Sequence, residues 1–422
     1  MLRYIIVYSY IIIFSGWIFN LLHIPAEIAK MIMQVMDFIP FLFLPVLFKL
    51  RRSFLVLPNT TVFWGIIFLF LFHSLFTTIM HGGNIVAACV HFGAMFRYAP
   101  LAAVLSRINL TDSDINTFLR YFKILSVILV GIGFVELIGG PSVSQYFMPI
   151  TDEVSSINNI MDESSEINLI GGTLFGIFPN TVDYSFFLFI SYIIISNISK
   201  LSNKFLVGLV YAVIIFFTGS KATLLIFLLV ISIQLSRYRF WVASFWLFIF
   251  VSGAILIYKF WELFYWTVFI DSQSSRLGYI IFTLPDFLSE FSFDTFFGVS
   301  ADKELVWAKI NSYPNAPKMT WGIDHMTSFE DEFYVALPVY YGILGFSLIL
   351  LFFVGLYKSL MGSKWKSDIL KYGIIIKSLF VCLLIAPLFN QIIIIKPFSL
   401  FFWIIVGLIT SQKGNAIKNY IK

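Results

Sequence analysis

The stretch VFWGIIFLFLFHSLFTTIM, residues 62–80, decides the class of fold that this chain can adopt. It carries no Asp, Glu, Lys or Arg. Its length is close to the roughly 20 residues that an α-helix needs to cross the hydrocarbon core of a bilayer. The stretch therefore predicts a membrane-spanning helix.

Similar apolar runs occur along the whole chain. Of its 422 residues, 59% are hydrophobic and 12% are charged, against about 45–50% and about 25% in soluble domains. We therefore expect an all-α, polytopic transmembrane bundle of about twelve spans, forming one domain over residues 1–422 with the lipid bilayer as its main partner. The candidate spans are 2–22, 31–48, 62–80, 84–106, 121–139, 172–196, 204–218, 221–235, 240–258, 332–357, 372–390 and 393–411.

The basic residues predict the orientation of the bundle. If the amino terminus is cytoplasmic, most of the 28 Lys and Arg residues fall in inner loops or at inner span ends. Because positive residues favour the cytoplasmic side, we expect both termini in the cytoplasm. The net charge of +5 is then explained by topology, and no nucleic-acid partner is expected.

Two predicted outer loops are long. Residues 140–170 form an acidic loop without Lys or Arg, and residues 259–331 form a larger loop between spans 9 and 10. The larger loop has aromatic residues and both signs of charge. We expect it to form a small extracytoplasmic subdomain.

The spans 204–218 and 221–235 are unusually short for a pair that crosses out and back. Their turn, Thr218 to Lys221, is therefore expected to lie below the outer surface, where non-helical backbone must be buried in protein or line a cavity. Lys221 would sit at the amino end of the next helix, a favourable place for an anion. The alternative is a tilted pair with Lys221 reaching to the surface.

Three further groups of residues are candidates for a site. Asn180 and Asp183 share a helix face and are predicted to bind substrate hydroxyls, or else to start a helix, with Asn180 as its cap. Arg276 suits bidentate phosphate recognition, and its alternative is a solvated loop arginine. Arg97, within a span, has an open role because a charge there must face protein, water or the interface.

The large loop ends in three carboxylates, Glu330, Asp331 and Glu332, at the predicted mouth of the bundle. A partly buried carboxylate there would serve as a general base, and the alternative is an acidic helix amino terminus. His325 is a weaker candidate for the same role. The chain has no phosphate-binding glycine loop and no metal-site spacing of His or Cys, so neither a cofactor nor a metal is expected.

Taken in order, several short segments resemble the bacterial O-antigen polymerase and O-antigen ligase superfamily of polytopic membrane glycosyltransferases. The segments are 172–180 (GTLFGIFPN), 218–222 (TGSKA), 275–276 (SR), 331–334 (DEFY) and 342–346 (GILGF), with the large outer loop among them. Ligases typically have a His-Asn pair where this chain has Asp331 and Glu332, and polymerases often have an Asp, so the departure favours a polymerase. Lys221 stands where the superfamily usually has Arg, which keeps the charge but loses bidentate geometry.

The resemblance implies a GT-C-like enzyme that joins undecaprenyl-pyrophosphate-linked oligosaccharide repeat units on the periplasmic face of the bacterial cytoplasmic (inner) membrane, in lipopolysaccharide synthesis. Asp331 would be the base, with Glu330, Glu332 or His325 as substitutes, and Lys221 and Arg276 would stabilise the leaving pyrophosphate. A chain-length regulator protein is left open as a partner. The alternatives are an O-antigen ligase that transfers the chain to lipid A core, a flippase for the same lipid-linked unit, and a scaffold or receptor.

Overall fold

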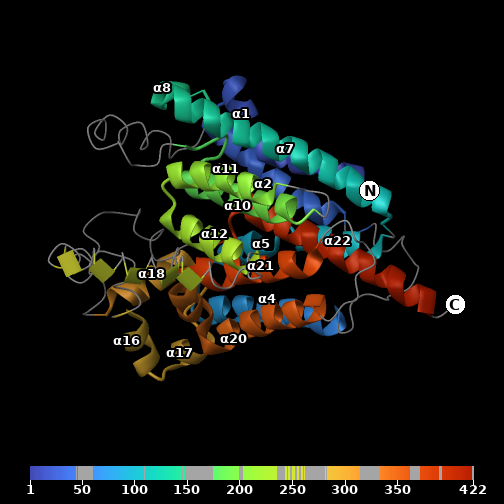
Figure 1. The fold of residues 1–422 in the computed structure, drawn as a ribbon. Helices are drawn as coiled ribbons and strands as arrows, with labels where there is room; N and C mark the ends of the chain where they lie inside the picture. The colour runs from blue at the N-terminus through green and yellow to red at the C-terminus, as the bar shows by residue number, and fades with distance from the viewer. Residues whose placement is uncertain are drawn as a thin grey trace.

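The structure is a computed structural model, and it describes residues 1–43, 60–108, 110–144, 146–147, 174–198, 203–234, 283–313, 333–361, 371–388 and 392–420, with residue 45 and separate residues between 243 and 281. Within these ranges the regular elements are helices, and no β-strand occurs among them. Figure 1 shows most of them side by side in one bundle. The prediction of an all-helical fold is confirmed.

The helices of the bundle are α1 (Leu2–Leu21), α2 (Ala26–Leu42), α4 (Thr60–Met80), α5 (Ile85–Phe96), α6 (Ala99–Arg107), α7 (Asp112–Gly139), α10 (Thr181–Ser196), α11 (Lys204–Phe217), α12 (Lys221–Gln234), α20 (Phe333–Met361), α21 (Tyr372–Ile385) and α22 (Lys396–Tyr420). Three of them, α1, α7 and α20, are long and apolar enough to cross a membrane, and the bent pair α5 and α6 makes a fourth if it is one span. Six further apolar helices in the described ranges are shorter.

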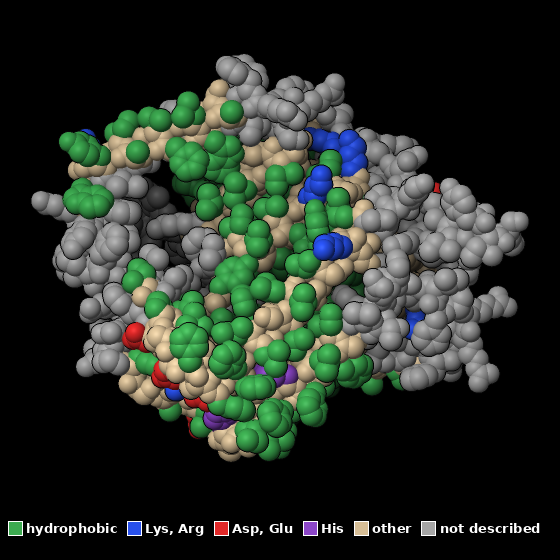
Figure 2. All heavy atoms as spheres, turned by 90° about the horizontal axis from the view of Figure 1, so that it is seen from below, with side chains coloured by type: hydrophobic (Ala, Val, Ile, Leu, Met, Phe, Trp, Pro, Cys, Tyr) green, Lys and Arg blue, Asp and Glu red, His purple; other side chains and the backbone are tan. Residues whose placement is uncertain are grey.

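Apolar side chains cover much of the described part of the face seen in Figure 2. Ile138 is 86% exposed, Leu42 is 74% exposed and Phe72 is 69% exposed. Large apolar side chains gathered over a whole face would associate in water, whereas lipid solvates them. Long apolar helices with apolar outer faces are what an integral membrane protein requires.

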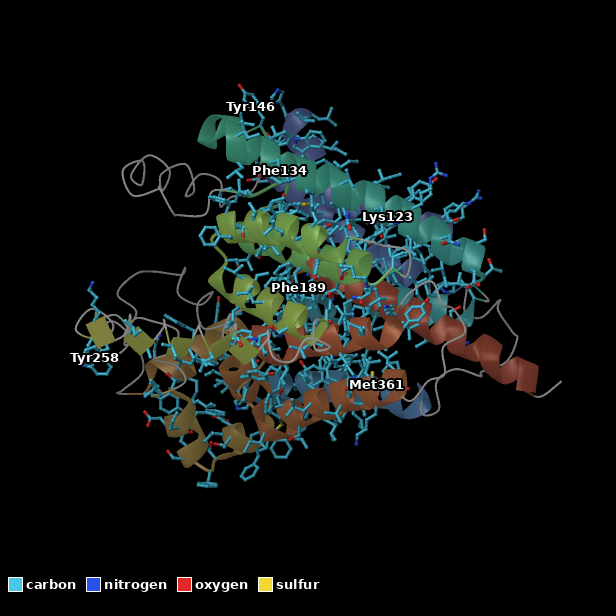
Figure 3. All side chains as sticks on the ribbon, viewed as in Figure 1. Lys123, Phe134, Tyr146, Phe189, Tyr258 and Met361 are labelled. Carbon is cyan, nitrogen blue, oxygen red and sulfur yellow. The ribbon has the colours of Figure 1, made fainter. Side chains whose placement is uncertain are left out.

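Helix α10 forms the centre of the bundle. Every residue from Tyr184 to Ser196 is buried, and Phe189, labelled in Figure 3, lies among the surrounding helices. α10 packs against α7, α11, α12, α21 and α22. A helix that is apolar on all sides is stable only when protein or lipid surrounds it, and here protein does.

Three short helices of the predicted large loop lie at one end of the bundle: α16 (Leu284–Ser289), α17 (Phe293–Phe297) and α18 (Lys303–Asn311). The chain after α17 contacts the backbone of α20 directly. Val299 N donates to Val339 O at 2.9 Å, and Gly298 and Gly342, both with positive φ, face each other without side chains. A Cβ atom at either glycine would meet backbone of the other segment.

Helices occur at the predicted spans that fall in the described ranges, and the span expected at 240–258 lies mostly outside them. The bounds differ most in three places. The helix expected at 121–139 begins at Asp112, because Thr111 and Asp114 cap each other's backbone. The helix expected at 172–196 begins at Thr181, after its cap. The span expected at 84–106 is broken between α5 and α6, which meet at 48°, and Pro lies in the first turn of α6.

Candidate functional site

The amino-terminal ends of three helices, α10, α12 and α22, lie at the same depth along the bundle. Ser185 Oγ in the first turns of α10 lies 2.8 Å from Thr223 Oγ1 of α12. The ring of Phe186 lies 6.1 Å from that of Phe398, near the start of α22. Since helix amino termini carry partial positive charge, three such ends point toward the same side of the bundle.

The same helices also run in the same direction. At the far end of α10, Tyr192 donates a hydrogen bond to Gln234 Oε1 at the end of α12, with a distance of 3.0 Å. α12 has 14 residues, as does α11 before it, so each is only about 21 Å long. A bilayer core is roughly 30 Å thick, and the short lengths agree with the predicted recessed turn.

The turn between α11 and α12 is built by its own side chains. Thr218 donates from Oγ1 to Ile215 O at 2.7 Å, Gly219 takes a positive φ of 72°, and Ser220 Oγ lies 2.8 Å from Thr223 Oγ1. Lys221 is the first residue of α12, as predicted. The turn therefore places Lys221 at a helix amino terminus.

Asn180 is the cap of α10. Its Oδ1 accepts a hydrogen bond from the backbone N–H of Asp183 at 2.7 Å. This is the capping alternative that the sequence left open, and it is confirmed. Binding of substrate hydroxyls by Asn180 and Asp183 stays a prediction, and both residues are partly exposed at the level of the other helix starts.

A charged cluster at the break between α5 and α6 was not predicted. Asp37 of α2 accepts from Arg97 Nη1 at 2.9 Å and from Lys396 Nζ at 3.0 Å. Arg97 Nη2 also donates to the carbonyl of Ile394, just before α22. The cluster joins α2, the α5–α6 break and the amino terminus of α22.

This cluster lies at the same level as the helix starts. α6 packs along α22, with Arg97 beside Ile394 at one end and Ile108 hydrogen-bonded to Ser411 at the other. The two helices are therefore parallel. The side chain of Arg97 is only 9% exposed and that of Asp37 18%, so the ion pair is shielded from solvent. An acidic residue inside the apolar run 31–48 was the available signal for it.

A second buried carboxylate holds the segment that leads into α10. Glu136 of α7 is 1% exposed, and its Oε2 accepts from the backbone N–H of Gly176 at 2.9 Å. Gly176 has a positive φ of 58°, and a Cβ atom there would meet the ring of Tyr184. The segment 174–180, part of the resemblance to the superfamily, is thus fixed against α7 and α10.

The remaining predicted site residues, Arg276, His325, Glu330, Asp331 and Glu332, lie outside the described residues. The described chain resumes at Phe333, directly after the three carboxylates. Tyr334 donates from its hydroxyl to Leu384 O at the end of α21, with a distance of 2.7 Å. The 3₁₀ turn after it, η5 (Ala386–Leu388), contacts both α12 and α20. The start of α20 is therefore close to the helix ends described above.

An ionic cluster attaches α16, α17 and α18 to the carboxyl end of α4. His81 Nε2 lies 2.9 Å from Asp294 Oδ1, and Lys309 Nζ lies 2.8 Å from Glu290 and 3.2 Å from Asp294. Burial opposes both charges of the Lys309–Glu290 pair, but their hydrogen bond leaves the pKa of Glu290 below and that of Lys309 above the ordinary value. The cluster gives α16–α18 a fixed position beside the bundle.

In the described part of the chain, no group of three or more His, Cys, Asp or Glu side chains is arranged to hold a metal ion. Comparisons with protein-family models, curated proteins and solved structures found no match. Function is therefore inferred from the residues and their arrangement.

Proposed function

We propose that the protein is a membrane glycosyltransferase of the O-antigen polymerase type, which joins lipid-pyrophosphate-linked oligosaccharide repeat units. The observation that carries the proposal is the common level of three helix amino termini, one of which begins with Lys221. Such an arrangement favours an anion at membrane depth, and a lipid pyrophosphate is an anion that is delivered there. The segments of the superfamily resemblance that fall in the described ranges include the cap of α10 and the turn before α12.

In the proposed reaction, a terminal sugar hydroxyl of one lipid-linked unit attacks the anomeric carbon of the growing chain. The new glycosidic C–O bond forms as the bond to the lipid pyrophosphate breaks, and the leaving group takes the electron pair. Asp331 would accept the hydroxyl proton, while Lys221 and Arg276 would stabilise the charge that develops on the pyrophosphate. Asn180, Asp183, Glu330, Glu332 and His325 are proposed to bind the sugars.

The proposal includes a twelve-span, GT-C-like bundle in a bacterial inner membrane, with both termini in the cytoplasm and the reaction on the periplasmic face. Undecaprenyl pyrophosphate is the proposed carrier. The outer-loop helices α16–α18, held by His81 and Asp294, would then lie on the side of the reaction.

Transport of the lipid-linked unit is the second candidate. The broken pair α5 and α6, with the Asp37–Arg97–Lys396 cluster at the break, resembles the interrupted helices and buried charges of secondary carriers. A flippase and a polymerase act on the same lipid-linked unit. Genetics separates them by the product that accumulates.

The test is deletion of the gene in its host, followed by gel analysis of surface polysaccharide. Loss of a polymerase leaves lipid A core with a single repeat unit. Loss of a ligase leaves polymer on the carrier lipid and none on the core. Loss of a flippase leaves neither the core-linked unit nor the polymer outside the cytoplasmic membrane. A full-length ladder in the deletion strain would contradict the polymerase proposal.

Complementation then tests the site. Asp331→Asn, Arg276→Ala and Lys221→Ala are each expected to reduce polymer formation by about 100-fold or more, the cost of losing a group that stabilises the transition state. Glu304→Gln, at an exposed residue of α18, is the control and should restore the ladder. Membrane levels of each variant are measured by immunoblot. Wild-type chain lengths with Asp331→Asn would exclude that residue as the base.

A further inference from the structure

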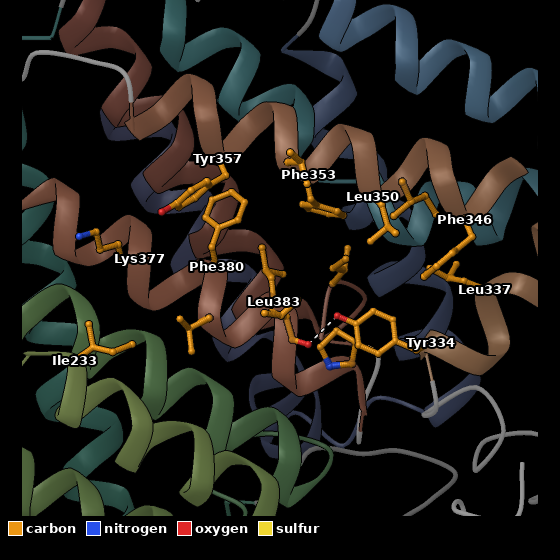
Figure 4. Close-up of a pocket in the computed structure, with 16 residues that line it drawn as sticks. Ile233, Tyr334, Leu337, Phe346, Leu350, Phe353, Tyr357, Lys377, Phe380 and Leu383 are labelled. Atoms are coloured by element: carbon orange, nitrogen blue, oxygen red, sulfur yellow. Dashed lines mark hydrogen bonds between the residues drawn. The ribbon is translucent and has the colours of Figure 1, made fainter. Parts of the chain in front are cut away.

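An apolar groove lies between α20 and α21, and it runs from Tyr334, near the helix starts of the candidate site, to Lys377 at the opposite end. Its volume is about 520 Å³. Figure 4 shows the lining side chains of the two helices turned toward each other, with Ile233 of α12 at one side. Among the lining residues, Lys377 is the single charged side chain.

The groove is open along its side. Leu350, Val354 and Leu384 line it and are 41%, 49% and 65% exposed. In a bundle surrounded by lipid, such an opening faces hydrocarbon chains. One end of the groove is held together by the hydrogen bond from Tyr334 to Leu384, drawn as a dashed line in Figure 4.

The opposite end of the groove is basic. Lys377 lies there with Tyr357 (Figure 4), and Lys358 follows directly in α20. Both lysines are exposed, and within the described residues neither pairs with an acidic side chain. α21 starts at this end, where Lys371 N donates to Asn197 O at the end of α10. The orientation rule predicts that this end is cytoplasmic.

The length of the groove fits one leaflet of a bilayer. From Lys377 to Pro387 the chain advances roughly 15 Å at the rise of an α-helix. Half of a hydrocarbon core of roughly 30 Å is the same length. A chain in the groove would therefore run from the headgroup level at Lys377 to the middle of the membrane.

We propose that this groove binds an anionic phospholipid of the cytoplasmic leaflet. One acyl chain lies between α20 and α21, and the phosphate pairs with Lys377, with Lys358 adding positive charge. Basic pockets between membrane helices on the cytoplasmic side suit anionic headgroups, because each cation contributes about 1 kcal/mol of attraction. The proposal is independent of the proposed reaction.

The test uses full-length protein in a neutral maltoside detergent and native mass spectrometry. Dioleoylphosphatidylglycerol is the anionic probe, and dioleoylphosphatidylethanolamine is the probe without net charge. We expect the wild type to retain the anionic lipid about fivefold more than the other, and Lys377→Ala to lose that preference. Lys377→Arg and the control Lys123→Ala, an exposed lysine on α7, should keep it.

Filling the groove tests the position of the acyl chain. Leu350→Trp is expected to lower retention of the anionic lipid about tenfold, as expected for the loss of one buried chain segment. Val354→Trp is the second variant if Leu350→Trp does not give a monodisperse protein. Equal retention of both lipids by the wild type, or anionic-lipid retention unaffected by Lys377→Ala or by the tryptophan variant, would overturn the proposal.

Discussion

At the scale of single residues, Asp37 is the carboxylate that both cations of the charged cluster share. It accepts from both Arg97 and Lys396, so its removal leaves the largely buried Arg97 without its carboxylate, whereas the side chain of Lys396 is 38% exposed. Breaking a buried ion pair costs about 3 kcal/mol or more. We expect Asp37→Ala to lower the melting temperature of the detergent-solubilised protein clearly, while Asp112→Ala, in the exposed first turn of α7, changes it little.

A double-variant cycle separates this pairing from general damage. The double variant Asp37→Ala with Arg97→Ala should lose less stability than the two single variants together, because Asp37→Ala leaves Arg97 without its carboxylate and Arg97→Ala takes one of the two cations from Asp37. Additive losses would show that the two side chains are not coupled. The cluster would then not be the element that holds the α5–α6 break.

At the scale of elements, the contact between Gly298 and Gly342 positions the outer-loop helices. Gly342 has a positive φ of 66°, and a Cβ atom there would meet the backbone of Phe296 and Gly298. Gly342→Ala should therefore destabilise the protein by about 1–3 kcal/mol from its backbone conformation alone, because a φ of 66° with a ψ of −179° is essentially restricted to glycine, and release α17 from α20. Faster proteolysis of the loop in the variant, at constant protease, is the measurement.

Gly355→Ala in the same helix is the matched control. A Cβ atom added at Gly355 would have no neighbour within 4 Å, and this glycine has no positive φ. Alanine favours a helix interior over glycine by about 1 kcal/mol, so this variant should be as stable as the wild type or more stable. If both glycine variants behave alike, the close approach does not hold the outer-loop helices.

The sequence predicts where the apolar helices lie better than it predicts where a span is broken. Hydropathy locates apolar helices because each run is long and continuous, and α1, α4, α11 and α12 agree with their predicted ranges within a few residues. The break at Arg97 could not be found in this way. It depends on Asp37, 60 positions earlier in the chain, and on Ile394 near the carboxyl end.

At the scale of the whole molecule, the sequence predicts part of the candidate site and misses another part. Lys221 and Asn180 stand at helix starts, as expected, because turn and capping residues are local signals. The sequence shows Asp37 inside an apolar run, but its pairing with Lys396 is not local, so the sequence pattern does not identify this partner. What brings these groups to one level is the parallel packing of α6 with α22 and of α10 with α12.

The orientation of the whole bundle gives the last prediction. α16–α18 lie at one end of the bundle, and the carboxyl-terminal end of α22 lies at the other (Figure 1). Because most basic residues of the sequence fall in the predicted inner loops, we expect the second end in the cytoplasm. In a Cys89→Ala, Cys382→Ala background, Glu304→Cys on α18 should react with a membrane-impermeant maleimide in spheroplasts, and Ser113→Cys at the start of α7 only after lysis. The reverse labelling would place the outer-loop helices in the cytoplasm, where they could not meet a periplasmic substrate, and would contradict the proposed reaction.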